Sequence, residues 1–164
     1  MDVTTALSSS SYNNNHSTGF TLIELMVTIA VLAIIVSIAA PNISTQLANQ
    51  RVKATTATLV SALKEAKAES VIRRQSITLV VDQTNKTIEL QRIVDKQVES
   101  TLATYTFNLK SAIKSDSTNT KFEPSKVANA MEYTICDNNT SISPMKVVVS
   151  ATAAISTKSE GDCT

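Results

Sequence analysis

The sequence predicts an α+β protein in which one long N-terminal helix packs against an antiparallel β-sheet. Three observations point to this class. An almost uninterrupted apolar run covers residues 20–40, an amphipathic helical pattern continues to about Gln75, and segments rich in Val, Ile and Thr follow. The helical and strand signals are therefore separated along the chain, which is typical of α+β folds.

The apolar run is about 21 residues long and contains one ionisable side chain, Glu24. A helix of about 21 residues rises about 32 Å, enough to cross a hydrocarbon core of about 30 Å. A charge at the centre of a bilayer costs about 3 kcal/mol even on lenient scales, so an acid placed there usually has a partner and a function. The run therefore predicts a membrane or assembly helix with a specific role for Glu24.

A signal anchor or a secretory signal peptide would also place a polar segment before an apolar one, but neither explains Glu24. A secretory signal also needs a basic N-terminal region, and residues 1–19 contain no Lys or Arg. The nearest basic residues, Arg51 and Lys53, follow the run and would by themselves favour the opposite orientation.

A second helical stretch, residues 42–75, continues the apolar run. Val52, Leu59, Leu63 and Ala66 repeat at helical spacing and predict one buried stripe. Pro41 lacks a backbone N–H, so we expect a kink where the apolar run ends.

The remainder, residues 76–164, is expected to be rich in β-structure, with a sheet of about five or more strands. Residues 77–81, 87–94 and 98–107 are separated by polar turn segments and predict an antiparallel meander. Two further strands are predicted at 131–136 and 145–155. Residues 108–129 are polar and contain Pro124, so they predict a long loop with little regular structure.

The segment Gly-Phe-Thr-Leu-Ile-Glu-Leu at residues 19–25, followed by an apolar helix, resembles the signature of type IV prepilins and type II secretion pseudopilins. The resemblance implies that a prepilin peptidase cleaves between Gly19 and Phe20 and methylates the new amino terminus of Phe20. Glu24 and Pro41 match the assembly acid and the helix proline of the family. The implied domains are a leader (1–19), a transmembrane and assembly helix (20–41) and a periplasmic head (42–164), which together form a lollipop.

Parts of the stretch 51–79 resemble the helix and first strand of the GspH/FimT/FimU branch of minor pilins. This resemblance implies a low-abundance subunit that helps to initiate or cap a pilus. Its expected partners are other major and minor pilins, the prepilin peptidase and, before assembly, the inner membrane. The alternatives are a DNA-binding competence pilin of the FimT type and a type II secretion minor pseudopilin of the GspH type.

For assembly, we expect the Glu24 carboxylate to be neutralised by the α-amino group of Phe20 on a neighbouring subunit. An unpaired ammonium and an unpaired carboxylate are both costly in hydrocarbon, so pairing them favours one axial register.

The chain has two cysteines, Cys136 and Cys163, and a formal net charge of +1. In an exported domain the pair is most simply interpreted as a disulfide, with two buried free thiols as the alternative. Its loop of about 28 residues would remove about 3.6 kcal/mol of unfolded-state entropy in the chain-entropy model. Loss of the leader removes Asp2, the only formal charge there, and changes the net charge from +1 to +2.

The sequence argues against an enzyme. Its glycines are Gly19 and Gly161 and its one histidine is His16, so the mature chain would have neither a Gly-rich phosphate loop nor a histidine base or metal ligand. The pair Glu65 and Glu69 is more typical of a solvated helix face than of acid–base catalysis. We therefore expect no cofactor, no metal and no small-molecule substrate.

DNA is a less favoured partner. Residues 42–75 carry six basic and two acidic side chains, an excess of +4, which makes Arg73 and Arg74 candidate phosphate contacts. However, DNA-binding relatives carry a basic Gly-Arg-x-Arg patch late in the head. Here residues 150–157 contain no charged side chain.

Overall fold

The computed structural model describes residues 19–94, 97–117, 119–139 and 142–163, without the side chains of residues 39–42. The chain divides into two compact units, Met1–Ala39 and Ala40–Thr164. We describe each unit by itself and call the second unit the head.

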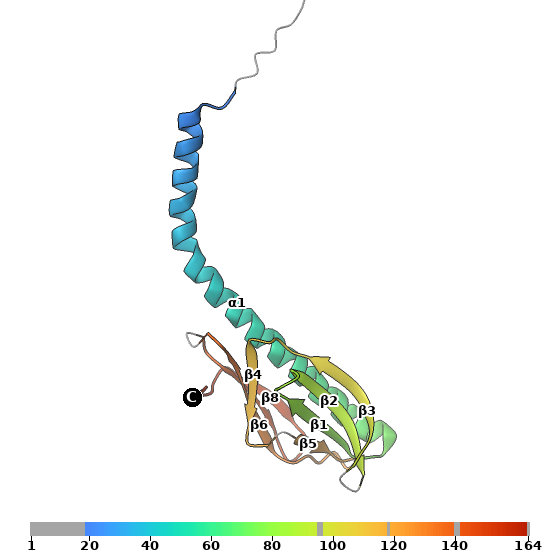
Figure 1. Ribbon diagram of the computed structural model, residues 1–164. Coiled ribbons are helices and arrows are strands. Elements are labelled where there is room, and N and C mark those ends of the chain that lie inside the picture. Colours follow the sequence, from blue (N-terminus) through green and yellow to red (C-terminus); the bar gives the residue numbers. More distant parts are fainter. Residues whose placement is uncertain (1–18, 95–96, 118, 140–141, 164) are drawn as a thin grey trace, which may run out of the picture. The chain divides into compact units, whose positions relative to one another are not determined.

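One helix and eight strands are assigned within the described residues (Figure 1). They are, in chain order, α1 (Leu22–Arg73), β1 (Ile77–Asp82), β2 (Thr87–Val94), β3 (Gln97–Thr106), β4 (Ser111–Ser115), β5 (Asn119–Phe122), β6 (Met131–Asp137), β7 (Met145–Val149) and β8 (Ile155–Lys158). A long N-terminal helix followed by antiparallel sheets confirms the predicted α+β class.

Helix α1 begins directly after an N-cap at Thr21. The Thr21 Oγ1 accepts a hydrogen bond from the Glu24 N–H at 3.2 Å, and the Thr21 carbonyl accepts one from the Leu25 N–H at 3.2 Å. The backbone of α1 continues through Pro41. The predicted kink is at Pro41, one of the residues 39–42 whose side chains the structure does not describe. The kink therefore stays a prediction.

Helix α1 ends at Arg73, two residues before the predicted end at Gln75. The Gln75 N–H donates to the Ser70 carbonyl at 3.2 Å, and the Arg74 N–H donates to the Val71 carbonyl at 3.4 Å. Arg74 has a φ of 53°. This pair of bonds around a left-handed residue is a Schellman motif, which satisfies the last carbonyls of the helix.

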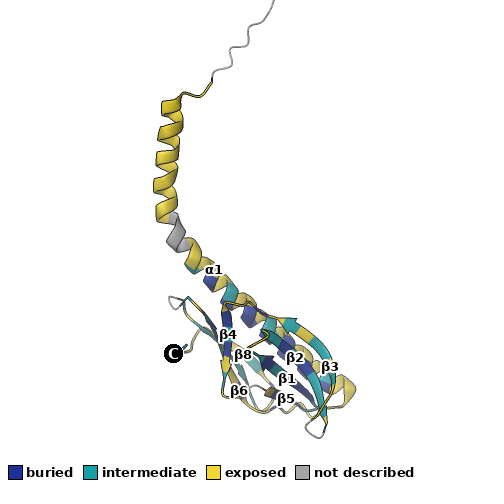
Figure 2. Ribbon diagram, in the orientation of Figure 1, coloured by how far each residue is buried: buried dark blue, intermediate teal, exposed yellow. Residues whose placement is uncertain are grey.

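The apolar stripe predicted for the second part of α1 is confirmed. Val52, Leu59, Leu63 and Ala66 are at most 1% exposed and belong to one core cluster that also contains residues of both sheets (Figure 2). Burial of these side chains, rather than helix propensity, fixes this face of α1 on the head.

The head contains two four-stranded antiparallel sheets, with strand orders β3-β2-β1-β5 and β4-β6-β7-β8. The predicted meander is confirmed as β1–β3 in the first sheet. After β3 the chain enters the second sheet as β4, returns to the first sheet as β5, and then completes the second sheet. These three crossings link the sheets covalently.

The prediction of a long loop over residues 108–129 was wrong, because this stretch contains β4 and β5. Both strands are short and mostly polar, but alternate side chains enter the interior: Ile113 on β4, and Thr120 and Phe122 on β5. Backbone pairing with β6 and β1 decides the conformation of these segments, against a composition that suits a loop.

The single strand predicted over residues 145–155 was also wrong. A tight turn separates β7 from β8: the Ser150 N–H donates to the Ala154 carbonyl at 2.9 Å, and the Ala153 N–H donates to the Ser150 carbonyl at 2.9 Å. Ala153 has a φ of 54°, and its side chain is fully buried.

Candidate assembly surfaces

The first unit contains an exposed helix whose side chains are mostly apolar. Its large hydrophobic side chains from Phe20 to Ile38 are 51–76% exposed (Figure 2). Apolar surface of this extent marks a site of contact with a membrane or with another protein. Within the described residues, no single helix has the length and hydropathy of a membrane span, whereas the segments Leu22–Ile38 and Ile43–Arg73 together do, by length and composition alone.

The polar side chains in this segment are of two kinds. The Thr28 and Ser37 hydroxyls donate to the Leu25 and Ile34 carbonyls at 2.8 and 2.7 Å, so their donors are satisfied within the helix and suit an apolar environment. Glu24 differs from them. Its side chain is exposed, and its carboxylate has no hydrogen bond or ion pair with any described residue.

Gly19 and Phe20 precede α1 and are exposed. A Cβ placed on Gly19 would meet no atom within 4 Å, and Phe20 is 75% exposed. The peptide bond between them therefore lies outside the helix, at exposed residues. That position suits a peptidase substrate, while the cleavage itself stays a prediction.

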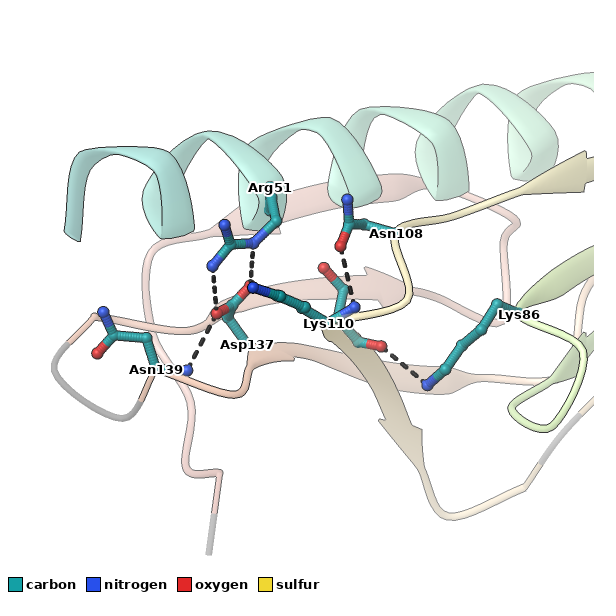
Figure 3. Close-up of polar contacts among 7 residues, drawn as sticks. Arg51, Lys86, Asn108, Lys110, Asp137 and Asn139 are labelled. Carbon is teal, nitrogen blue, oxygen red and sulfur yellow. Dashed lines mark hydrogen bonds and ion pairs between the residues drawn. The ribbon is translucent and has the colours of Figure 1, made fainter. Parts of the chain in front are cut away.

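In the head, a partly buried ion pair joins α1 to the second sheet (Figure 3). Arg51 donates to both carboxylate oxygens of Asp137 on β6, at 2.8 and 2.9 Å. The Asp137 side chain is fully buried, and the Asn139 N–H donates to it at 3.0 Å. The Arg51 guanidinium holds the pKa of Asp137 below its ordinary value, because its hydrogen bonds favour the carboxylate over the neutral acid.

The structure contains the predicted disulfide between Cys136 and Cys163, whose Cα atoms are 5.9 Å apart. It attaches the C-terminal residues to β6, next to Asp137. Two further contacts hold this tail: the Lys114 Nζ donates to the Cys163 carbonyl at 2.6 Å, and Gly161 lies against Thr134. A Cβ on Gly161 would lie 2.9 Å from the Thr134 Cγ2, and the φ of +146° also favours glycine.

The structure does not gather the basic residues of α1 into an open phosphate-binding surface. Arg51 is paired with Asp137, the Lys67 Nζ donates to the Ala153 carbonyl at 2.7 Å, and Arg73 is paired with Glu69. Arg74 is exposed at the helix end. Half of the six cations counted in the sequence are therefore engaged within the head, which reduces the charge available to a polyanion.

Sequence reasoning missed three positioning residues, Asp137, Gln83 and Lys86. Asp137 is 86 residues from Arg51, so no local pattern predicts that they pair. Gln83, in the turn between β1 and β2, bonds the backbone of Ile113, and the Lys86 Nζ donates to the Ser111 carbonyl at 3.0 Å. These two side chains cover the free edge of β4, where an exposed strand would otherwise invite pairing with another chain. The uninterrupted polar run at residues 82–86 predicts the turn but does not indicate that two of its side chains bond β4.

A metal centre has no support in the part of the chain that the structure describes, because no group of three or more His, Cys, Asp or Glu side chains converges there.

Comparison with known proteins gives a family motif and a fold. The model of the prokaryotic N-terminal methylation motif matches residues 14–40. The fold is similar to that of the type IV minor pilin FimU of Pseudomonas aeruginosa, at 15% identity and a TM-score of 0.57, over 65% of this chain and 91% of that chain. In a second crystal form of FimU the TM-score is 0.53, at 15% identity, over 74% of this chain and 92% of that chain.

The fold is also similar to that of the minor pseudopilin EpsH from the type 2 secretion system of Vibrio cholerae. That match has 8% identity and a TM-score of 0.56, over 66% of this chain and 96% of that chain. No curated protein sequence matches the chain. Pilin-like neighbours of this kind are structural subunits and not enzymes. The chain therefore carries a prokaryotic N-terminal methylation motif at residues 14–40 and shares its fold with the type IV minor pilin FimU and the minor pseudopilin EpsH.

Proposed function

We propose that this chain is a minor type IV pilin that helps to initiate or cap a filament. Its N-terminal helix enters the filament core, and its head contacts other minor pilins. One observation carries the proposal: an exposed, mostly apolar helix precedes a compact head and bears one carboxylate that bonds no described residue. Both the apolar surface and the acid need partners that this chain does not supply within the described residues.

Processing and membrane anchoring belong to the same proposal. The peptidase cleaves the exposed bond between Gly19 and Phe20, and Phe20 becomes the methylated amino terminus. Before assembly, the subunit remains in the inner membrane with its head in the periplasm. The methylation motif and the N-terminal helix fit this anchoring.

In the filament, Glu24 pairs with the amino group of a neighbouring subunit. Transfer from lipid to filament then replaces an unpaired carboxylate by a paired one, which favours assembly and fixes the axial register. Pro41 ends the assembly segment, and the surface of the head determines which neighbouring subunit it binds.

A second candidate function is that of a minor pseudopilin in a type II secretion system. The likeness to EpsH supports it, since the TM-score of 0.56 nearly equals that for FimU. A DNA-binding competence pilin is the less favoured alternative, because three of the six cations in residues 42–75, Arg51, Lys67 and Arg73, are engaged within the head.

The test is to delete the gene, count surface filaments and measure type II protein secretion in the same strain. A minor pilin that initiates assembly predicts few filaments and normal secretion, with restoration by the intact gene. Sheared filaments should contain the chain at far below the amount of the major subunit. Normal filament numbers with a secretion defect would favour the pseudopilin instead, and a chain as abundant as the major subunit would contradict a minor role.

A further inference from the structure

We infer that the head carries its own contact site for an anionic lipid surface, formed by Leu47, Asn108, Leu109 and Lys110. We call it the Leu109 surface. The inference rests on the membrane anchoring in the proposed function and adds a second point of attachment, on the head itself. It concerns the subunit before assembly, while α1 still holds it at the membrane.

Leu109 is held outward by a rigid turn. It is 80% exposed, the largest exposure among the large hydrophobic side chains of the described residues. The Ser111 N–H donates to the Asn108 carbonyl at 2.9 Å, and the Lys110 N–H donates to the Asn108 Oδ1 at 2.9 Å. The Asn138 N–H donates to the Lys110 carbonyl at 3.0 Å, which fixes the turn to the end of β6. A turn tip usually carries a polar residue, so a leucine preorganised there suits a contact with an apolar phase.

The surroundings of Leu109 are apolar and basic. A shallow cavity of about 370 Å³ separates it from Leu47, which is 52% exposed on α1. The charged residues that line this cavity, among those described, are Arg51 and Lys110. The nearby carboxylate of Asp137 is buried and paired with Arg51, and the charge of Lys110 also lowers its pKa, so the three side chains together carry a net charge of +1. Figure 3 shows Lys110 beside this pair, on the loop that leads into β4.

This combination of leucine and lysine without a free acid is complementary to an anionic bilayer surface. Apolar side chains enter the boundary between headgroups and acyl chains, and lysines remain with the lipid phosphates. A protein partner for the same surface would need an apolar patch with a free carboxylate.

The covalent chain keeps the Leu109 surface close to the apolar run. Leu47 follows Ile38 by about nine residues, which span about 14 Å as a helix and at most about 32 Å if fully extended. This limit holds for any orientation of the head. A site tethered this closely to a membrane segment meets lipid at high effective concentration, so a few side chains suffice for contact.

The chain contains no tryptophan, so a single introduced indole reports its surroundings without background. The full-length Leu109→Trp variant is reconstituted into phosphatidylcholine vesicles with or without phosphatidylglycerol. We expect a blue-shifted emission and quenching by lipids brominated near the headgroup, both stronger in the anionic vesicles. When Lys110→Gln is added to the Leu109→Trp variant, the ratio of heads bound at the anionic vesicle surface to heads not bound there should fall about fivefold. This is the factor for about 1 kcal/mol per basic residue near an anionic surface.

Two control variants separate the possible failures. Val127→Trp replaces a residue that is 46% exposed in the turn near Ser70, and Ser70 is about 34 Å along α1 from Leu47. Its emission should not respond to the brominated lipids. Ile29→Trp in the apolar run should be quenched in both vesicle types, and if it is not, the membrane anchoring of the proposed function fails. A quenched indole at position 29 with an unquenched one at position 109 would overturn this inference alone. It would also be overturned if the emission from position 109 changed only with protein concentration, because the surface would then contact another subunit.

Discussion

At the C-terminal end of α1, Arg74 has a left-handed backbone with a φ of 53°. This position of a Schellman motif usually holds glycine, because a Cβ there crowds the following carbonyl at a cost of about 1 kcal/mol. Arg74→Gly should therefore stabilise the head by about 1 kcal/mol, even though it removes an exposed charge. Urea unfolding of the full chain in detergent measures the change.

The neighbouring Arg73 provides a matched control for this prediction. It is the last residue of α1 and is paired with Glu69, so Arg73→Gly should destabilise the head by about 1 kcal/mol. Arg74→Ala removes the same charge but keeps the Cβ, and it should leave stability nearly unchanged. Equal effects of the Gly and Ala variants at position 74 would contradict the explanation by backbone conformation.

Asp137 should make the head sensitive to acid. Its pKa is lower in the folded than in the unfolded state, because Arg51 bonds the ionised form. Its contribution is therefore present above the unfolded pKa of about 3.9 and is lost as the pH falls through the lower, folded pKa. Asp137→Asn should reduce the free energy of unfolding by about 2 kcal/mol at neutral pH and flatten its decline below pH 4.

The experiment compares urea unfolding of Asp137→Asn and of the unmodified chain over a series of pH values. Asp116→Asn, at an exposed carboxylate, is the control and should follow the unmodified chain. Parallel acid profiles for the Asp137 variant and the unmodified chain would show that the ion pair with Arg51 does not set the acid response.

At the scale of elements, the sequence predicted well where local periodicity and burial agree. The stripe from Val52 to Ala66 and the β1–β3 meander follow from side-chain spacing, because each buries one face against the core. The motif around Gly19 and Glu24 is equally local. These features need no knowledge of distant segments.

The elements that the sequence missed depend on distant partners. β4 and β5 are short, polar strands that form because β6 and β1 pair with them. The turn between β7 and β8 at Ser150–Ala154 contains no Gly, Pro, Asn or Asp that would have predicted it. The contact of Arg51 with Asp137 was missed for the same reason, because the two residues are far apart in the sequence. Tertiary pairing, rather than intrinsic propensity, decides these positions.

The disulfide is the element-scale feature whose energetic role is easiest to test. Replacing both Cys136 and Cys163 by serine should cost about 3 kcal/mol, because the loop of the unfolded chain is no longer closed. Reduction of the unmodified chain should give the same loss of stability in urea unfolding. Unchanged stability in both experiments would mean that Gly161 and Lys114 hold the tail without the covalent link.

For the whole molecule, the first test concerns processing at Gly19. A side chain at this position would enter the peptidase site together with the scissile bond, so Gly19→Val should leave an uncleaved precursor in the membrane. Mass spectrometry of the membrane-extracted chain identifies the N-terminus. Gly161→Val is the control, because it changes the only other glycine and leaves the motif intact. A methylated Phe20 in the Gly19→Val variant would show that glycine is not required for cleavage.

In the proposed function, Glu24 connects the membrane state of the subunit to its filament state. An unpaired carboxylate in lipid would cost about 3 kcal/mol, and the proposed pairing with a neighbour's amine would remove that cost on assembly. Glu24→Ala abolishes both the cost and the pairing, so it should shift the equilibrium toward the membrane by up to about a hundredfold, the factor for about 3 kcal/mol. The variant should stay membrane-inserted and be cleaved normally, but be nearly absent from sheared filaments.

Glu65→Ala, at an exposed carboxylate of the head, is the matched control and should enter filaments at the unmodified level. If Glu24→Ala enters filaments as well as this control does, then the apolar surface of α1 is sufficient for assembly and the carboxylate serves another purpose.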